Sequence, residues 1–267
     1  ITGSDATRPS LWFRNVLEGS IPKGVSASGN TFGSAAGFTR TAVRIDGINN
    51  LLIGDASVAG ANIILEDNSG LTNAATHDGH VIYLANVSNT TVDNLELSST
   101  IGYQGRGIYF ANSADNSNNT VKNCKINTRF VGIYCAGGKD YTILNNDLKG
   151  TGNDLTRPAI YLLGVKPGVI ASGVAASGNL FGTGTSRTAI RVENMDGLLI
   201  GDAVVAGANV VLEDNSGANN MSTDGDQQAV IYLTNASNIT VDNVDVSRTA
   251  AGRDTSTLST VIFDAFV

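Results

Sequence analysis

Three side chains between residues 129 and 139 have types that suit proton transfer: Arg129, Tyr134 and Lys139. A β-elimination requires an arginine or lysine that removes a proton and a tyrosine that supplies one. These three residues are therefore candidate catalytic residues. Whether they meet depends on the elements that position them, because nothing in their spacing brings them together on its own.

Acidic residues gather in two corresponding segments, 55–80 and 202–229. Carboxylates among carbonyl-rich loops can bind calcium or a ligand, although the spacing matches no calcium loop. The alternative is that these carboxylates are solvated or cap turns. The candidate ligand-binding residues are Glu66, Asp67, Glu213 and Asp214, and the candidate calcium ligands are Asp55, Asp67, Asp202 and Asp214.

Histidine and cysteine are scarce in this chain. His77 and His80 flank an Asp-Gly pair and could act in acid–base chemistry or bind a metal. Their polar surroundings instead predict a solvated loop. Cys124 and Cys135 have no zinc-type spacing, so we expect them to be buried as apolar residues, with a disulfide within one coil as the alternative.

The two acidic segments belong to a large internal duplication. Leu51–Gly70 returns about 147 positions on as Leu198–Gly217 with three differences, and further matching segments give a unit of about 149 residues. Arg44 and Arg191 also correspond, inside strands, where we expect them to point outward or to pair with a carboxylate. The interpretation is one domain, 1–267, with a first unit 1–149 and an incomplete second unit 150–267, in a natural protein that is longer.

A shorter pattern recurs within each unit and predicts a strand, a bend and another strand. It places Gly or Asn between two apolar positions, as in Leu52–Ser57, Val92–Leu97 and Val121–Ile126. Gly and Asn enter the left-handed backbone region at least cost, so they mark the bends. A further strand follows each bend, often with the dipeptide Ile-Tyr. No sustained helical period or two-residue hairpin appears, which favours a coil of short strands with parallel pairing. Asn94, Asn123 and Asn145, at equivalent bends, are expected to stack as an amide ladder.

Segments 119–126, 132–134 and 141–148 resemble the parallel β-helix repeats of the pectate-lyase-like superfamily, and the resemblance extends over nearly the whole chain. It implies an all-β fold, a right-handed parallel β-helix. That superfamily includes lyases, hydrolases, epimerases, phage spikes and adhesins, and in its lyases calcium bridges an acidic sugar to the protein. The chain lacks the Asp-Asp and Gly-His-Gly motifs of the polygalacturonases and the Asp-Pro-His motif of the alginate epimerases.

The composition narrows the range of partners. A net charge of −7 and the absence of a basic cluster argue against nucleic acid, and no apolar run is long enough for membrane insertion. We therefore expect a structural or adhesive segment of a large secreted, cell-surface protein. Its partners would be a polysaccharide or other surface ligand and neighbouring coils or subunits, with no cofactor except possible calcium. The alternatives are a polysaccharide lyase and a fibre subunit that stacks end to end.

Overall fold

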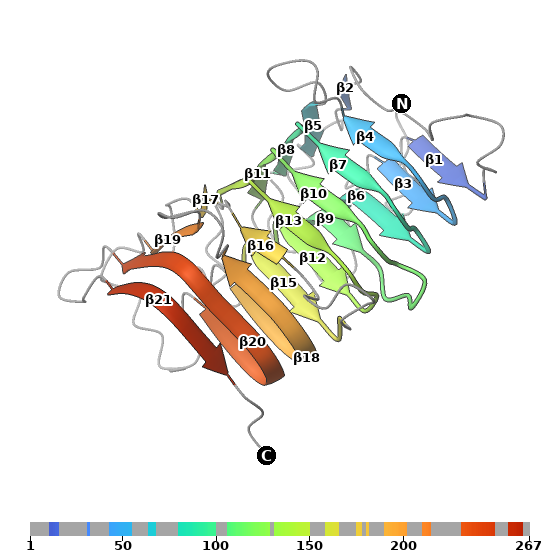
Figure 1. The fold of residues 1–267 in the computed structure, drawn as a ribbon. Coiled ribbons are helices and arrows are strands. Elements are labelled where there is room, and N and C mark those ends of the chain that lie inside the picture. The colour runs from blue at the N-terminus through green and yellow to red at the C-terminus, as the bar shows by residue number, and fades with distance from the viewer. Residues whose placement is uncertain are drawn as a thin grey trace, which may run out of the picture.

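The chain folds into short β-strands that stack on one another along the molecule, almost all with parallel pairing (Figure 1). This all-β arrangement, seen in a computed structural model, is that of a parallel β-helix and agrees with the predicted fold class. The structure describes residues 11–15, 31–32, 43–54, 64–67, 80–99, 106–128, 131–149, 158–165, 175–177, 180–181, 190–201, 210–214, 231–248 and 256–263.

The strands form three columns, and each turn of the coil adds one strand to each column. Column one contains β1 (Leu11–Arg14), β3 (Val43–Asp46), β6 (His80–Ala85), β9 (Arg106–Phe110), β12 (Ile133–Ala136) and β15 (Ile160–Leu163). Column two contains β4 (Leu52–Gly54), β7 (Thr91–Asp93), β10 (Thr120–Lys122), β13 (Thr142–Leu144) and β16 (Ala175–Ser177). Column three contains β2 (Thr31–Phe32), β5 (Ile64–Asp67), β8 (Glu96–Ser99), β11 (Lys125–Thr128), β14 (Asp147–Lys149), β17 (Leu180–Phe181) and β19 (Val210–Asp214).

Three long strands complete the stack towards the C-terminus (Figure 1). β18 (Ile190–Gly201) continues columns one and two, and β20 (Ile231–Arg248) continues all three. β21 (Ser256–Phe263) pairs with β20 in the antiparallel direction. The sequence predicts a purely parallel coil, so this antiparallel pairing is a difference from the prediction.

Apolar side chains of successive coils stack in the interior. In column one, Ile82, Ile108, Ile133 and Ile160 lie in register and are fully buried. Burying a side chain of this size stabilises the fold by about 1.5–3 kcal/mol, so each coil adds several such contributions to the core. The core is therefore one continuous stack of apolar side chains. Inward and outward residues alternate along each strand, and this alternation determines which side chains face outward.

The two cysteines belong to this core. Cys124 and Cys135 are buried free thiols, which confirms the expected burial and rules out the disulfide alternative. Burial raises the pKa of Cys124 to about 12 and raises the pKa of Cys135 as well. Both side chains therefore stay protonated and act as apolar packing groups.

The predicted bends are confirmed between columns two and three. Asn94, Asn123 and Asn145 have φ values of 55°, 55° and 53°, and Gly54, which pairs with Asp93 one residue earlier in the register, has a φ of 99°. The predicted amide ladder at these bends is not what the structure shows for Asn123, whose Nδ2 donates to Oδ1 of Asp93 at 2.8 Å. The Asp93 carboxylate of the preceding coil accepts this hydrogen bond in place of a neighbouring amide, because a charged acceptor makes the stronger hydrogen bond.

Amide pairs between coils do form at other turns. Nδ2 of Asn118 donates to Oδ1 of Asn89 at 2.6 Å, and Nδ2 of Asn235 donates to Oδ1 of Asn194 at 3.1 Å. All four of these asparagines have positive φ angles. The same residue type thus both permits the turn and links adjacent coils.

Strands also form inside the two inserted acidic segments. β5 pairs with β8 and β19 pairs with β20, both in parallel, so each insertion contributes a strand to column three. The described part of the chain contains no helix with the length and apolar character needed to cross a membrane.

Candidate functional site

A straight column of aromatic and arginine side chains runs along the outside of column one. The column arises because inward and outward residues alternate along each strand. Each of its members lies between two inward residues, as Arg44 does between the buried Val43 and Ile45. We call this column the ladder. Its members, in parallel register on eight successive strands, are Trp12, Arg44, Tyr83, Tyr109, Tyr134, Tyr161, Arg191 and Tyr232.

The tyrosines in the middle of the ladder pack against one another. The ring centroids of Tyr83 and Tyr109 are 5.5 Å apart, those of Tyr109 and Tyr134 are 5.1 Å apart, and those of Tyr134 and Tyr161 are 4.7 Å apart. These distances follow from the spacing of about 4.8 Å between hydrogen-bonded strands. Tyr109, Tyr134 and Tyr161 stack on one another, with interplanar angles of 28° and 5°, whereas Tyr83 meets Tyr109 edge-on at 72°. In the stacked part, the ring edges and hydroxyl groups are the parts left for a ligand.

Guanidinium groups extend this packing towards both ends of the ladder. Arg44 lies 5.4 Å from the Trp12 ring centroid and 4.6 Å from that of Tyr83. Arg191 lies 5.3 Å from the Tyr161 centroid and 5.1 Å from that of Tyr232. Distances below about 6 Å correspond to cation–π contacts, which hold the planar cations in place while leaving N–H donors at the surface.

Arg44 and Arg191 also meet the carboxylates two residues further along their own strands. Nη2 of Arg44 lies 3.9 Å from Oδ2 of Asp46, and Nε of Arg191 donates to Oε1 of Glu193 at 2.7 Å. Both observations confirm the prediction that these arginines point outward and pair with acidic residues. Their duplication in the sequence thus reflects equal places in the ladder.

Glu193 fixes a neighbouring tyrosine as a hydrogen-bond donor. The Tyr161 hydroxyl donates to Oε2 of Glu193 at 2.6 Å. Burial and this bond raise the pKa of Tyr161 well above its ordinary value. Its hydroxyl therefore stays protonated and held in one orientation.

A third arginine and a histidine lie beside the ladder. The Arg106 guanidinium lies 4.7 Å from the Tyr109 ring centroid and 5.0 Å from that of Tyr134, and its Nη1 is 3.4 Å from Nε2 of His80. Arginine has no acceptor, so Nε2 of His80 must accept and its Nδ1 must carry the proton. Arg106 therefore adds another cation to the surface of the ladder, as does Arg14, which lies 5.9 Å from the Trp12 ring centroid.

His80 is the first residue of β6 and only 3% exposed, which overturns the prediction that it lies on a solvated loop. Its ring packs against Tyr83 and Tyr109, with centroid distances of 5.6 and 4.7 Å. Burial, Arg106 and Arg44 lower its pKa to about 3. The sequence suggested a loop because His80 follows polar residues, but the next residues, starting with Val81, belong to the core. His77 lies outside the described residues.

The lowered pKa of His80 predicts a pH-dependent stability. The unfolded chain binds a proton near pH 6.5 and the folded chain does not, so stability is complete above pH 6.5 and falls as the pH drops. Between pH 6.5 and pH 5 we expect a loss of up to about 2 kcal/mol in the free energy of unfolding. Urea unfolding of the wild type and His80→Gln measures it. The variant, which keeps His77, should lose much less over the same range, and equal losses in both proteins would contradict the assignment.

The structure separates two of the three candidate catalytic residues. Tyr134 is a member of the ladder, whereas Lys139 lines a polar groove at the turn that follows β12. Arg129 lies outside the described residues, so its part in the predicted set is still a prediction.

The acidic candidates are placed only through their backbones. Glu66 pairs with Ser98 and Asp67 pairs with Ser99, between β5 and β8. Glu213 and Asp214 pair with Ser247 and Arg248 in the same way, between β19 and β20. Asp55 and Asp202 lie outside the described residues, and the calcium and ligand roles of all six acidic residues are still predictions.

The ladder is the candidate functional surface that sequence reasoning missed. Its signal was present, because the dipeptide Ile-Tyr recurs at Ile82, Ile108, Ile133, Ile160 and Ile231. Once parallel pairing in register is assumed, a repeated apolar–aromatic pair places every aromatic residue in one outward column. On their own, the repeated pairs indicate strands and not a shared surface.

Comparison with protein families identifies the scaffold. The model of the family described as periplasmic copper-binding protein (NosD) matches residues 20–157, just over half of the chain. This chain belongs to the NosD family. The matched region contains the ladder from Arg44 to Tyr134 and most of the regular coils, in keeping with a parallel β-helix. No curated protein and no solved structure gave a significant match.

The described residues do not fit the copper ion in the NosD family description. Among them, no three His, Cys, Asp or Glu side chains come together as a metal site. The Cys124 thiol is buried and protonated, with its Sγ 3.1 Å from the Lys122 carbonyl oxygen, and His80 directs Nε2 at a cation. Copper prefers thiolate, thioether and neutral imidazole ligands grouped around one position. No such group is present in this part of the chain.

Proposed function

We propose that this chain is a segment of an exported NosD-family β-helix whose ladder binds an extended acidic polysaccharide. The observation that carries the proposal is the column of eight aromatic and arginine side chains in unbroken register. The periplasmic location in the family description supports a place outside the cytoplasm, where such polymers occur. If the ladder binds the polysaccharide without cleaving it, the role of the protein is adhesive or structural, at the cell surface.

The shape of the ladder favours a linear polymer over a small molecule. Seven steps of about 4.8 Å between coils make a straight row of roughly 34 Å. A ligand with a regular repeat can meet the same donors again and again along such a row, and each additional contact adds to the affinity without further loss of translational freedom. The row extends over both units of the duplication of about 149 residues that the sequence predicts, from Trp12 in the first unit to Tyr232 in the second.

The chemistry of the ladder favours carboxylate-bearing sugars. Four cations lie along the ladder, against the two nearby carboxylates of Asp46 and Glu193: they are Arg44, Arg106, Arg191 and Arg14, which lies 5.9 Å from the Trp12 ring centroid. Tyrosine hydroxyls and guanidinium N–H groups are donors, and carboxylates are the acceptors that guanidinium groups bind best. The rest of the chain carries a net negative charge, so such a ligand should bind only along this strip.

Calorimetric titration with polygalacturonate, and with dextran as a neutral polymer, tests the proposal. We expect polygalacturonate to bind, with an affinity that falls as salt is added, and dextran to bind much more weakly. The double variant Arg106→Gln with Arg191→Gln should weaken binding by about tenfold or more, since two cationic contacts are lost.

The matched control removes two positive charges from β10 and β11, away from the ladder, by Lys122→Gln with Lys125→Gln. It should change the affinity by less than about twofold, because both lysines lie in other columns than the ladder and Lys122 is paired with Asp93, Nζ lying 3.4 Å from Oδ2. Equal weakening in both double variants, or no binding of polygalacturonate by the wild type, would refute the proposed role. No unsaturated uronate should appear in these mixtures, since the proposed ladder binds the polymer without cleaving it by β-elimination.

A further inference from the structure

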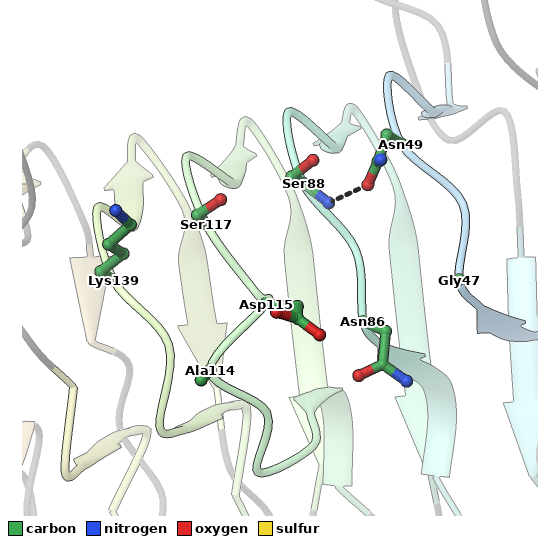
Figure 2. Close-up of a pocket in the computed structure, with 8 residues that line it drawn as sticks. All are labelled: Gly47, Asn49, Asn86, Ser88, Ala114, Asp115, Ser117 and Lys139. Atoms are coloured by element: carbon green, nitrogen blue, oxygen red, sulfur yellow. Dashed lines mark hydrogen bonds between the residues drawn. The ribbon is translucent and has the colours of Figure 1, made fainter.

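A second, polar groove lies at the turns that follow the strands of column one (Figure 2). Its volume is about 550 Å³, within the range of small-molecule sites. Its lining comes from four successive coils, and the polar members are Asn49, Asn86, Ser88, Asp115, Ser117 and Lys139. The ladder contributes none of these side chains.

One side of the groove is a row of side chains at equal places in successive coils. Ser88 forms a parallel bridge with Ser117, and Ser117 forms one with Lys139. Oδ1 of Asn49 accepts a hydrogen bond from the Ser88 backbone N–H at 2.9 Å, which joins the first coil to the row (Figure 2). Two hydroxyls and an ammonium group therefore follow one another at steps of about 4.8 Å.

The opposite wall is a bulge in a single coil. Seven residues, 111–117, occupy the place that the four residues 85–88 fill in the preceding coil, so the bulge has three additional residues. Three hydrogen bonds hold it: Ser113 Oγ donates to Asn86 Oδ1 at 2.6 Å, the Asp115 N–H donates to Ser113 Oγ at 3.1 Å, and Asn116 Nδ2 donates to the Ala111 carbonyl at 2.6 Å. The wall is thus fixed before any ligand arrives, which lowers the entropic cost of binding.

The lining is polar and electrically balanced. Asp115 and Lys139 contribute opposite charges, and Ser88 and Ser117 contribute hydroxyls that both donate and accept. Figure 2 shows the Asp115 carboxylate between the two sides of the groove, level with Asn86. Such a mixture matches a ligand with many hydroxyl groups and no net charge, because sugar hydroxyls also donate and accept, and a carboxylate can accept from two neighbouring hydroxyls.

We propose that this groove is a second ligand site that binds a short neutral oligosaccharide lying across the coils. It differs from the ladder in ligand charge, in ligand length and in the residues that bind. The groove has no aromatic platform, so its affinity should be in the millimolar range. The proposal does not depend on polysaccharide binding by the ladder.

Titration of the full chain with cellotriose and with maltotriose, followed by amide chemical shifts in NMR, tests this site. We expect saturable shifts at Ser88, Ser117 and Lys139 with at least one of the two sugars, and weaker binding of trigalacturonate. Asp115→Ala, an exposed position, should weaken binding by roughly tenfold, since a charged acceptor is lost. The control Glu96→Gln, which removes an exposed carboxylate from β8, should leave the affinity unchanged.

The ladder variant Arg106→Gln with Arg191→Gln separates this proposal from the first one. It should bind the neutral trisaccharide like the wild type, whatever its effect on polygalacturonate. Shifts confined to the ladder, equal weakening by Asp115→Ala and Glu96→Gln, or the absence of saturable shifts with both neutral sugars would overturn the proposed groove site.

Discussion

Replacing Gly54 by alanine should destabilise the protein by about 3 kcal/mol or more, because two unfavourable effects combine at one bend. Gly54 has a φ of 99°, which side chains rarely adopt, and a Cβ placed there would lie 1.8 Å from the Asp93 carbonyl oxygen and 2.8 Å from Cδ2 of Leu95. The contact is with the backbone of the next coil, so a rotamer change cannot relieve it. Equilibrium unfolding in urea, monitored by circular dichroism, measures the loss.

A second glycine provides the matched control for this substitution. Gly164 also has a positive φ, 63°, but nothing lies within 4 Å of the position that a Cβ would take. Gly164→Ala should therefore cost only the conformational penalty, about 1 kcal/mol. If both variants lost the same stability, the close approach of adjacent coils at Gly54 would not be the cause.

Replacing the buried Asn119 by alanine should cost about 2–4 kcal/mol, because the Thr90 N–H loses the only acceptor that the structure shows for it and the Val87 carbonyl keeps only its bond from the Ser117 N–H. Oδ1 of Asn119 accepts from the Thr90 N–H at 3.0 Å, and its Nδ2 donates to the Val87 carbonyl oxygen at 3.1 Å. Asn119 is 1% exposed, so water cannot easily replace these bonds. The free energy of urea unfolding is again the measurement.

The neighbouring Asn118 distinguishes this buried role from the general effect of losing an asparagine. Its side chain is exposed and donates only to Asn89 in the contacts that the structure describes. Because Asn118 has a φ of 55°, Asn118→Ala should cost about 1 kcal/mol, from the left-handed backbone and one exposed hydrogen bond. A loss at Asn118 as large as that at Asn119 would mean that the turn conformation, and not the buried hydrogen bonds, determines the effect.

Local residue patterns explain why much of the coil was predictable. The apolar–Gly/Asn–apolar frame depends on backbone sterics alone, and it correctly placed the bends at Gly54, Asn94, Asn123 and Asn145. The alternation in strands such as Ile133–Ala136 then determined which residues face inward. These features need no knowledge of which coil packs against which.

Features that depend on contacts between coils were not predictable in the same way. The burial of His80 depends on Tyr83 and on two residues of the next coil, Tyr109 and Arg106. The hydrogen bond from Asn123 to Asp93 depends on which side chain the preceding coil presents. The polar groove depends on an insertion in one coil beside unmodified neighbours. In each case the deciding partner is about 25–30 residues away in the sequence, and only the register of the stack brings it near.

The ladder is the central element of this account, and its members were visible in the sequence without their arrangement. Arg44 and Arg191 looked like duplicated structural residues, and Tyr134 looked like a possible catalytic acid. Register unites them in one surface, where Tyr134 packs between two other tyrosines. A tyrosine held on both faces by aromatic rings is better suited to binding than to proton transfer with a distant lysine.

A crystal structure of the protein with a bound oligogalacturonate would test this account most directly. We predict that the sugar chain lies along the outside of column one, parallel to the axis of the coil, with carboxylates at Arg44, Arg106 or Arg191. Sugar bound only away from the ladder, or aligned across the strands without contact to these arginines, would contradict the proposed function.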